Sequence, residues 1–283
     1  EVLGVVEKQH RGPGCCDARE SFSRRSDLER GSGTFARVDQ PGQGAEGNVG
    51  RCGVGSDVIV NAAVSSGSGH VTLNAVDDVD VNASITTGGS GTVYVAGDVI
   101  SLDASVTTAN GDVLISSTQE ITQTAAINST SGDVGLIAGT TITQSSSGDI
   151  TTNSGDVLIE AGTDWTMSNG TVITAGGGDF DGKAVSGNIA LGRINAARAA
   201  MSASGDISDA NGTTLNVDGT SLSLRAGGII GNHDNTNGMP STNTNAIDTQ
   251  IKAIALAKEM GVVGAPFTEL EERLERFKTD NGK

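Results

Sequence analysis

Residues 111–134 read GDVLISSTQEITQTAAINSTSGDV and open and close on the same Gly-Asp-Val step, 21 residues apart. Apolar and polar residues alternate near each such step, as in Val71-Thr72-Leu73-Asn74-Ala75. Alternation with a period of two predicts short strands with one buried face. The step recurs at Gly69-His70-Val71, Gly91-Thr92-Val93, Gly111-Asp112-Val113, Gly132-Asp133-Val134, Gly155-Asp156-Val157 and Gly178-Asp179-Phe180.

Two further short sequence patterns repeat at the same interval. Each unit of about 22 residues therefore has three sides. A unit of this length cannot close a core by itself and must stack on its neighbours. We therefore expect an all-β, right-handed parallel β-helix, because parallel crossovers are nearly always right-handed. Its inward stack is predicted to contain Val71, Val93, Val113, Val134 and Val157, and its outer row Thr86, Thr107, Asn128, Thr151 and Thr174.

Composition restricts the core to small aliphatic side chains. Aromatic residues make up 2% of the chain, which has 41 glycines. Trp165 is the exception, since it occupies a position that holds Val or Ile in other units. We expect it to fill a widened coil; displacement to the outside by a slip, or ligand stacking, are the alternatives.

The net charge of −16 is concentrated in residues 53–249, which carry four basic and twenty acidic side chains. Such a surface repels phosphate groups, which argues against nucleic acid and anionic membranes as partners. A helix that spans a bilayer needs a run of about 18 or more apolar residues, and the sequence has no run of that length. We therefore expect neither nucleic-acid binding nor membrane insertion.

The Gly-Asp-Val-x-Leu-x-Ala and Ala-x-Ile-Thr-Thr pattern resembles the repeats of filamentous haemagglutinin-like and autotransporter-type bacterial adhesins. The similarity covers about residues 53–249 and includes the segment Arg225-Ala-Gly-Gly-Ile-Ile-Gly. It implies export to the bacterial cell surface and a long β-helix that serves in adhesion or as a stalk. The partners implied are host or environmental glycans or proteins, or neighbouring segments of the same large protein.

The two ends of the chain follow different patterns. Residues 1–52 contain all three cysteines, lack alternation and are predicted to be poorly ordered. Residues 250–283 are predicted to form a helical tail, with helices over Gln250–Met260 and from Thr268 onward. The second helix would dock on or near the end of the β-helix, or else bind a partner.

An enzyme is the main alternative, because parallel β-helices also host polysaccharide lyases and hydrolases. Lys183, Arg193, Arg198 and Arg225 are the only cations of residues 53–249, and they form no recognisable acid–base cluster in sequence. If the first three converged beside Asp179 or Asp181 in a cleft, an enzyme that binds or degrades polysaccharide would be favoured. From the sequence we expect no enzymatic activity, no catalytic residues and no cofactor.

Several other patterns in the sequence have a simpler interpretation than a functional site. Asp77-Asp78-Val79-Asp80 could bind Ca²⁺ weakly, but aspartates at coil corners are explained by turn chemistry, so no metal site is predicted. His70 is interpreted as a surface turn residue. The outer threonine row permits ice binding as a less favoured alternative. Finally, Gly178 and Gly205 are 27 residues apart, which predicts a bulged coil or a protruding loop between Asp181 and Ala200.

Overall fold

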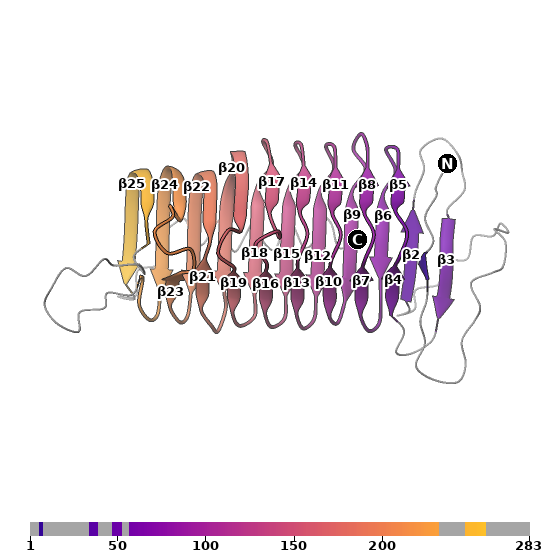
Figure 1. The fold of residues 1–283 in the computed structure, drawn as a ribbon, viewed down its shortest axis with the longest axis horizontal. Coiled ribbons are helices and arrows are strands. Elements are labelled where there is room, and N and C mark those ends of the chain that lie inside the picture. Colours follow the sequence, from indigo (N-terminus) through magenta and orange to yellow (C-terminus); the bar gives the residue numbers. More distant parts are fainter. Residues whose placement is uncertain (1–5, 8–33, 39–46, 53–56, 232–246, 259–283) are drawn as a thin grey trace, which may run out of the picture.

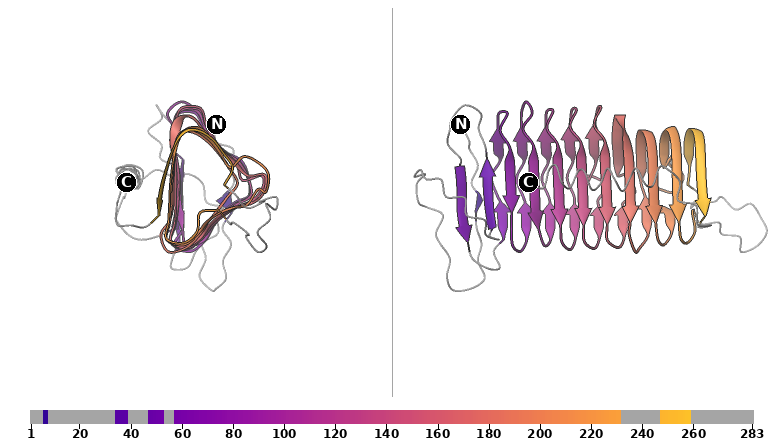
Figure 2. Two further views of the ribbon diagram at one scale, coloured as in Figure 1. Left: turned by 90° about the vertical axis from the view of Figure 1, so that its left-hand side faces the viewer. Right: turned by 180° about the vertical axis from the view of Figure 1, so that it is seen from behind.

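The computed structural model describes residues 6–7, 34–38, 47–52, 57–231 and 247–258. All regular elements in these residues are strands, and they wind into a parallel solenoid (Figure 1). Viewed along its axis, the solenoid has a triangular cross-section (Figure 2). The predicted parallel β-helix is therefore confirmed, with a coil of about 21 residues.

The first face of the triangle is a nine-stranded sheet, parallel except where β1 pairs with β4. Each coil from Val58 onward contributes one strand of three residues, and in all of these strands but the last the first and third side chains are buried. Its strands are β1 (Val6–Glu7), β4 (Val58–Val60), β7 (Val79–Val81), β10 (Ile100–Leu102), β13 (Ile121–Gln123), β16 (Ile142–Gln144), β19 (Trp165–Met167), β21 (Ile189–Leu191) and β23 (Ile207–Asp209).

The second and third faces belong to one 16-stranded sheet. The second face contains β5 (Val64–Ser66), β8 (Ile85–Thr87), β11 (Val106–Thr108), β14 (Ile127–Ser129) and β17 (Ile150–Thr152). The third face contains β6 (Val71–Asn74), β9 (Val93–Gly97), β12 (Val113–Ser117), β15 (Val134–Ala138) and β18 (Val157–Ala161). The later coils join both faces through β20 (Val172–Ala184), β22 (Arg193–Ala203) and β24 (Val217–Ala226).

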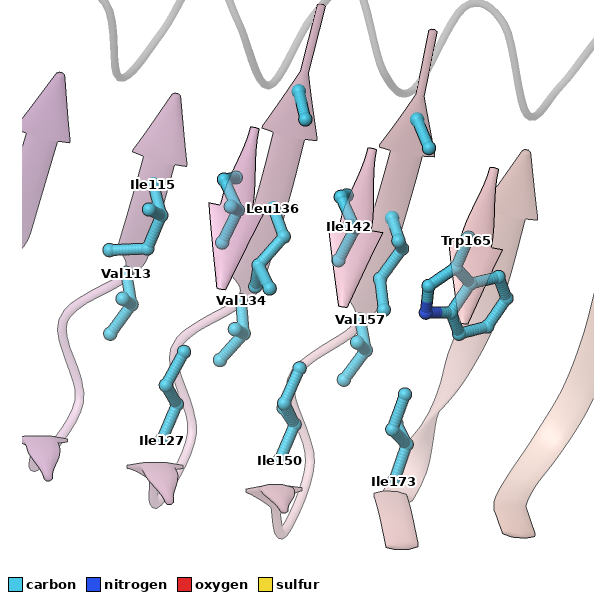
Figure 3. Packing of buried hydrophobic residues seen from close by; sticks show 14 of the residues in the cluster. Val113, Ile115, Ile127, Val134, Leu136, Ile142, Ile150, Val157, Trp165 and Ile173 are labelled. Carbon is cyan, nitrogen blue, oxygen red and sulfur yellow. The ribbon is translucent and has the colours of Figure 1, made fainter. Parts of the chain in front are cut away.

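The predicted inward stack forms the centre of the core. Val71 pairs with Val93, and the stack continues in register through Val113, Val134 and Val157. These side chains are buried, and Figure 3 shows several of them in line along the axis. Because adjacent strands lie about 4.8 Å apart, the same side chain meets a similar one in every coil.

The glycines of the Gly-Asp-Val steps are required by close stacking at the corner between the second and third faces. A Cβ added to Gly132 would lie 2.1 Å from the carbonyl oxygen of Gly111, and one added to Gly155 would lie 2.1 Å from that of Gly132. Neither glycine has a positive φ. Space between coils, and not backbone conformation, therefore excludes a side chain here.

The aspartate of the step links successive coils at the same corner. The Asp112 carboxylate accepts a hydrogen bond from the backbone N–H of Asp133 at 2.8 Å, and the Asp133 carboxylate accepts one from Asp156 at 2.7 Å. On the inside, the Thr108 hydroxyl donates to the carbonyl of Gly111 at 2.6 Å. The second Thr of Val-Thr-Thr thus satisfies a buried backbone group, which explains a polar residue at an inward position.

Trp165 points into the core, as expected, and replaces the Ile or Val of other coils (Figure 3). Its ring lies 5.6 Å from that of Phe180, centroid to centroid. Its Nε1 donates to Gln144 Oε1 at 2.9 Å, and Gln144 Nε2 donates to Gln123 Oε1 at 2.9 Å. This buried amide row satisfies the indole N–H and was not predicted from the sequence.

Three strands lie within residues 1–52, where the sequence predicts little order. β2 (Thr34–Val38) pairs antiparallel with β6, and β3 (Gly47–Cys52) pairs antiparallel with β2. Together with β1, they cover strand edges of the first coil that would otherwise expose unpaired backbone groups. The other residues of this segment lie outside the described part of the chain.

The predicted helix over residues 250–260 is wrong for residues 250–258. This stretch forms strand β25 (Thr249–Lys258), which pairs parallel with β24, with Ile254 in register with Leu222 and Leu256 in register with Leu224. In this stretch alanines alternate with Ile254 and Leu256, which fits the period of two of a strand. Other apolar residues of the same stretch fit a helical period, which is why the sequence predicts a helix there. The solenoid therefore extends beyond the predicted boundary at residue 249. The predicted helix from Thr268 lies outside the described residues.

The predicted bulge between Asp181 and Ala200 is also wrong. Asp181 pairs directly with Ala200, in a coil of only 19 residues measured from Phe180 to Ala199. Gly205 stacks on Gly187 and Asn188 at a different corner from Gly178, so the two glycines do not measure one coil. The irregularity lies instead at Gly176–Gly178, between the pairs Ala175–Ala196 and Asp179–Arg198.

A charge placed inward should destabilise the coil far more than the same charge placed outward. Ile142 is fully buried, whereas its neighbour Thr143 is exposed. We expect Ile142→Asp to lower the free energy of unfolding by more than about 4 kcal/mol, and Thr143→Asp by less than about 1 kcal/mol. Chemical denaturation of both variants measures the difference, and equal losses would contradict the assigned faces.

Candidate functional site

The outward row of the second face is polar along its length. The predicted residues pair in register, as Thr86 with Thr107 and Asn128 with Thr151, and the Asn195 Nδ2 donates to Thr174 Oγ1 at 3.2 Å. The row extends beyond the prediction at both ends. Its described members are Ser65, Thr86, Thr107, Asn128, Thr151, Thr174, Asn195 and Asp218.

The first face has a shorter hydroxyl row. Ser101, Thr122, Thr143 and Thr166 follow one another in register and point outward. Ile59 and Ala190 occupy the same register near the ends of this face. Two of the three faces thus present fixed hydroxyl groups about 4.8 Å apart, which can donate and accept hydrogen bonds along the axis.

Arg198 lies between two carboxylates at the edge of the third face. Its guanidinium lies 3.1 Å from an Asp179 oxygen and 3.7 Å from an Asp181 oxygen. Arg193 lies instead 3.8 Å from the carboxylate of Asp218. Of the cations considered for an enzyme, Arg198 therefore meets both aspartates and Arg193 does not. Lys183 lies on the same strand as Asp181, two residues away, and is partly exposed.

The residues that could hold a metal are Asp57, Asp77 and Asp78, among those the structure describes. One carboxylate oxygen of each lies within 4.8 Å of the others. Oxygen ligands of this kind suit Ca²⁺. The sequence pointed to Asp77, Asp78 and Asp80; stacking of coils brings in Asp57, which no local pattern indicates.

Two aspartates of this acidic stretch, Asp78 and Asp80, have raised pKa values. Burial, followed by the negative charge of Asp77, raises the pKa of Asp78 above its ordinary value. Burial also raises the pKa of Asp80, with further contributions from Asp57 and Asp103. The backbone N–H of Val99 donates to the Asp78 carboxylate at 3.3 Å, so this residue also links two coils.

His70 is exposed at a corner, in agreement with its interpretation as a turn residue. Its Nδ1 lies 2.7 Å from the hydroxyl oxygen of Thr92 in the next coil. It therefore takes part in the same coil-to-coil contacts as the aspartates of other steps.

Comparisons with protein-family models, with curated proteins and with solved structures found no match. In the part of the chain that the structure describes, no helix is long and apolar enough to cross a membrane.

The raised pKa of Asp78 predicts a pH-dependent effect of Asp78→Asn. A carboxyl whose pKa is higher in the folded state destabilises that state when ionised, and the cost disappears as pH falls through the folded pKa. We expect the variant to be more stable than the wild type at pH 7, by up to about 0.5 kcal/mol because solvent screens the group. The difference should shrink toward pH 4 in thermal unfolding.

Asp149→Asn is a matched control, because the Asp149 carboxylate also accepts a backbone N–H, from Val172 at 2.8 Å, but lies at another corner. A stabilisation by Asp78→Asn that grows on acidification would contradict the proposed repulsion.

Proposed function

We propose that the chain is a structural and adhesive segment of a larger secreted or cell-surface bacterial protein, without catalytic activity of its own. The observation that carries this proposal is the uninterrupted polar row of the second face. Its members come from eight successive coils and repeat about every 4.8 Å, so a long extended ligand could contact many of them at once.

The solenoid supports a stalk role through its stiffness. Each coil is hydrogen-bonded to the next on three faces, and the core contains continuous stacks of aliphatic side chains. Close-packed interiors of this kind resist bending. A chain of this kind extends by about 4.8 Å per coil, which sets binding surfaces at a distance from their anchor. Export to the bacterial surface rests on the resemblance of the repeats to adhesins.

Glycans are the partners that the second face fits best. Sugar hydroxyls donate and accept hydrogen bonds, as do Thr, Ser and Asn side chains. Rigid rows of such groups need little ordering on binding, which lowers the entropic cost of each contact. Surface proteins, or neighbouring segments of the same large protein, could dock on the same row through their own polar groups.

Polysaccharide degradation is the second candidate, and the contact of Arg198 with both Asp179 and Asp181 favours it. Glycoside hydrolysis needs two carboxylates, one as an acid and one as a base or nucleophile. In this hypothesis Asp179, whose side chain is 33% exposed, would meet the sugar, while Asp181 is fully buried and would hold Arg198 in place. The pair therefore presents one accessible carboxylate, which makes this candidate the weaker one. The ice-binding alternative uses the threonine rows and predicts binding to ice crystals in place of sugars.

Binding to an array of intact bacterial and host glycans separates these candidates. We expect Thr107→Glu combined with Thr151→Glu to weaken the binding of the best glycan by about tenfold or more, since longer carboxylates, which cannot donate a hydrogen bond, replace two hydroxyl groups of the row and crowd the ligand. Thr122→Glu with Thr166→Glu, on the first face, is the matched control and should change binding by less than about twofold.

Two outcomes would contradict the adhesive proposal. One is the absence of binding to any glycan or surface protein tested. The other is release of new sugar ends from a bound polysaccharide, lost in Asp179→Asn, which would support the enzyme.

A further inference from the structure

The outward row of the third face is buried, although it points away from the core. Leu114 and Leu158 are each 2% exposed, and Asp181 and Ala200 are 0% exposed. All four belong to one register that runs from β12 to β22. Leu114 and Leu158 also form an apolar cluster separate from the main core, with Tyr94 and Ile137 packed against it.

The corresponding rows of the other two faces are not buried. On the second face Thr107, Asn128 and Thr151 remain partly exposed, and on the first face Thr143 and Thr166 are exposed. The outward rows differ in residue type as well as in exposure. The row of the third face includes Leu114 and Leu158, whereas the rows of the other two faces consist largely of residues with hydroxyl groups. The third face is therefore shaped to be covered along about four strand spacings, or about 19 Å.

We propose that residues 268–277 of this chain form an amphipathic helix that packs lengthwise on this row. Leu270, Leu274 and Phe277 repeat at intervals of four and three, which places them on one side of a helix. The spacing of Leu270 and Phe277 does not fit a strand, because residues seven apart would point to opposite sides of it. In this respect the segment differs from residues 250–258, which also fit a period of two.

The dimensions of the two apolar rows agree. Seven residues of helix separate Leu270 from Phe277, a rise of about 10.5 Å. Leu158 and Leu114 lie two strands apart, because β15 separates β18 from β12, which gives about 9.6 Å. A helix parallel to the solenoid axis would thus bring both of its ends onto leucines.

The chain is long enough to reach this position. β25 ends at Lys258, and four strand spacings, about 19 Å, separate β25 from β18. Residues 259–267 are nine residues, which span up to about 30 Å when extended. The connection therefore requires neither a second molecule nor any rearrangement of the solenoid.

The charges agree with the same placement. Arg193 and Arg198 form ion pairs with neighbouring aspartates. Lys183 on β20 and Arg225 on β24 share one outward register of the third face, on strands close to β25. The segment begins with Glu269, Glu271 and Glu272, and its own basic residues come later. With Leu270 over Leu158 on β18, this acidic start would lie beside β20, which carries Lys183.

Disulfide cross-linking in the full chain tests this proposal. Cys15, Cys16 and Cys52 are first replaced by Ser, and Leu158→Cys is combined with Leu274→Cys. Under mild oxidation we expect an intramolecular disulfide whose yield does not depend on protein concentration and exceeds that of the control by about tenfold or more, because docking raises the effective thiol concentration. The control combines Leu274→Cys with Thr166→Cys, an exposed position on the first face.

Leu114→Cys and Leu158→Cys are each paired in turn with Leu270→Cys, Leu274→Cys and Phe277→Cys, so that one poorly aligned pair does not decide the result. The proposal is overturned if no third-face pair exceeds the control, or if the cross-links join two chains, which would make a second copy the occupant. Cross-linking is independent of glycan binding, so it can fail while the proposed adhesive function holds.

Discussion

The close stacking of the corner glycines is the constraint on which the rest of the structure depends. A carbonyl of one coil lies where a Cβ of the next would stand, so successive coils must meet at the same residue of each repeat. Aspartates at the same corner fix this register further, since each carboxylate accepts the N–H of the next coil. With the corner in place, the period of two assigns every following side chain to the core or to the surface.

The three faces share this geometry but differ in what they present outward. The first and second faces carry hydroxyl and amide groups, whereas the third carries leucines that are buried. This difference divides the surface between contact with other molecules and contact within the chain. In our proposals, the second face binds glycans or proteins while the C-terminal segment covers the third, so a rod with two polar faces results. At the acidic corner, burial and the charge of Asp77 raise the pKa of Asp78, so the ionised form of this one side chain opposes the fold.

Most of the fold followed from sequence, because repetition reports one local rule many times. The Val71 stack and the Thr86 row were both predicted residue by residue. Errors arose where one observation had two interpretations. Ile251 and Ile254 fit one side of a helix, whereas Ile254 and Leu256 fit one side of a strand. Gly205 was assigned to the corner of Gly178 because both precede Asp. The cluster of Asp57 with Asp78 and the row from Gln123 to Trp165 join residues from different coils, so they become visible only when the coils are stacked.

Distances between spin labels along the second face test the stacked register most directly. Nitroxides at Ser65 and Thr151 lie four strand spacings apart, and those at Ser65 and Asn195 lie six apart, or about 19 Å and about 29 Å. Pulsed electron paramagnetic resonance, on chains with Cys15, Cys16 and Cys52 replaced by Ser, should give a narrow distance distribution for each pair of labels. The mean distances of the two pairs should differ by about 10 Å. Equal distances, or distances that do not increase with the number of coils, would contradict the solenoid and the surfaces built on it.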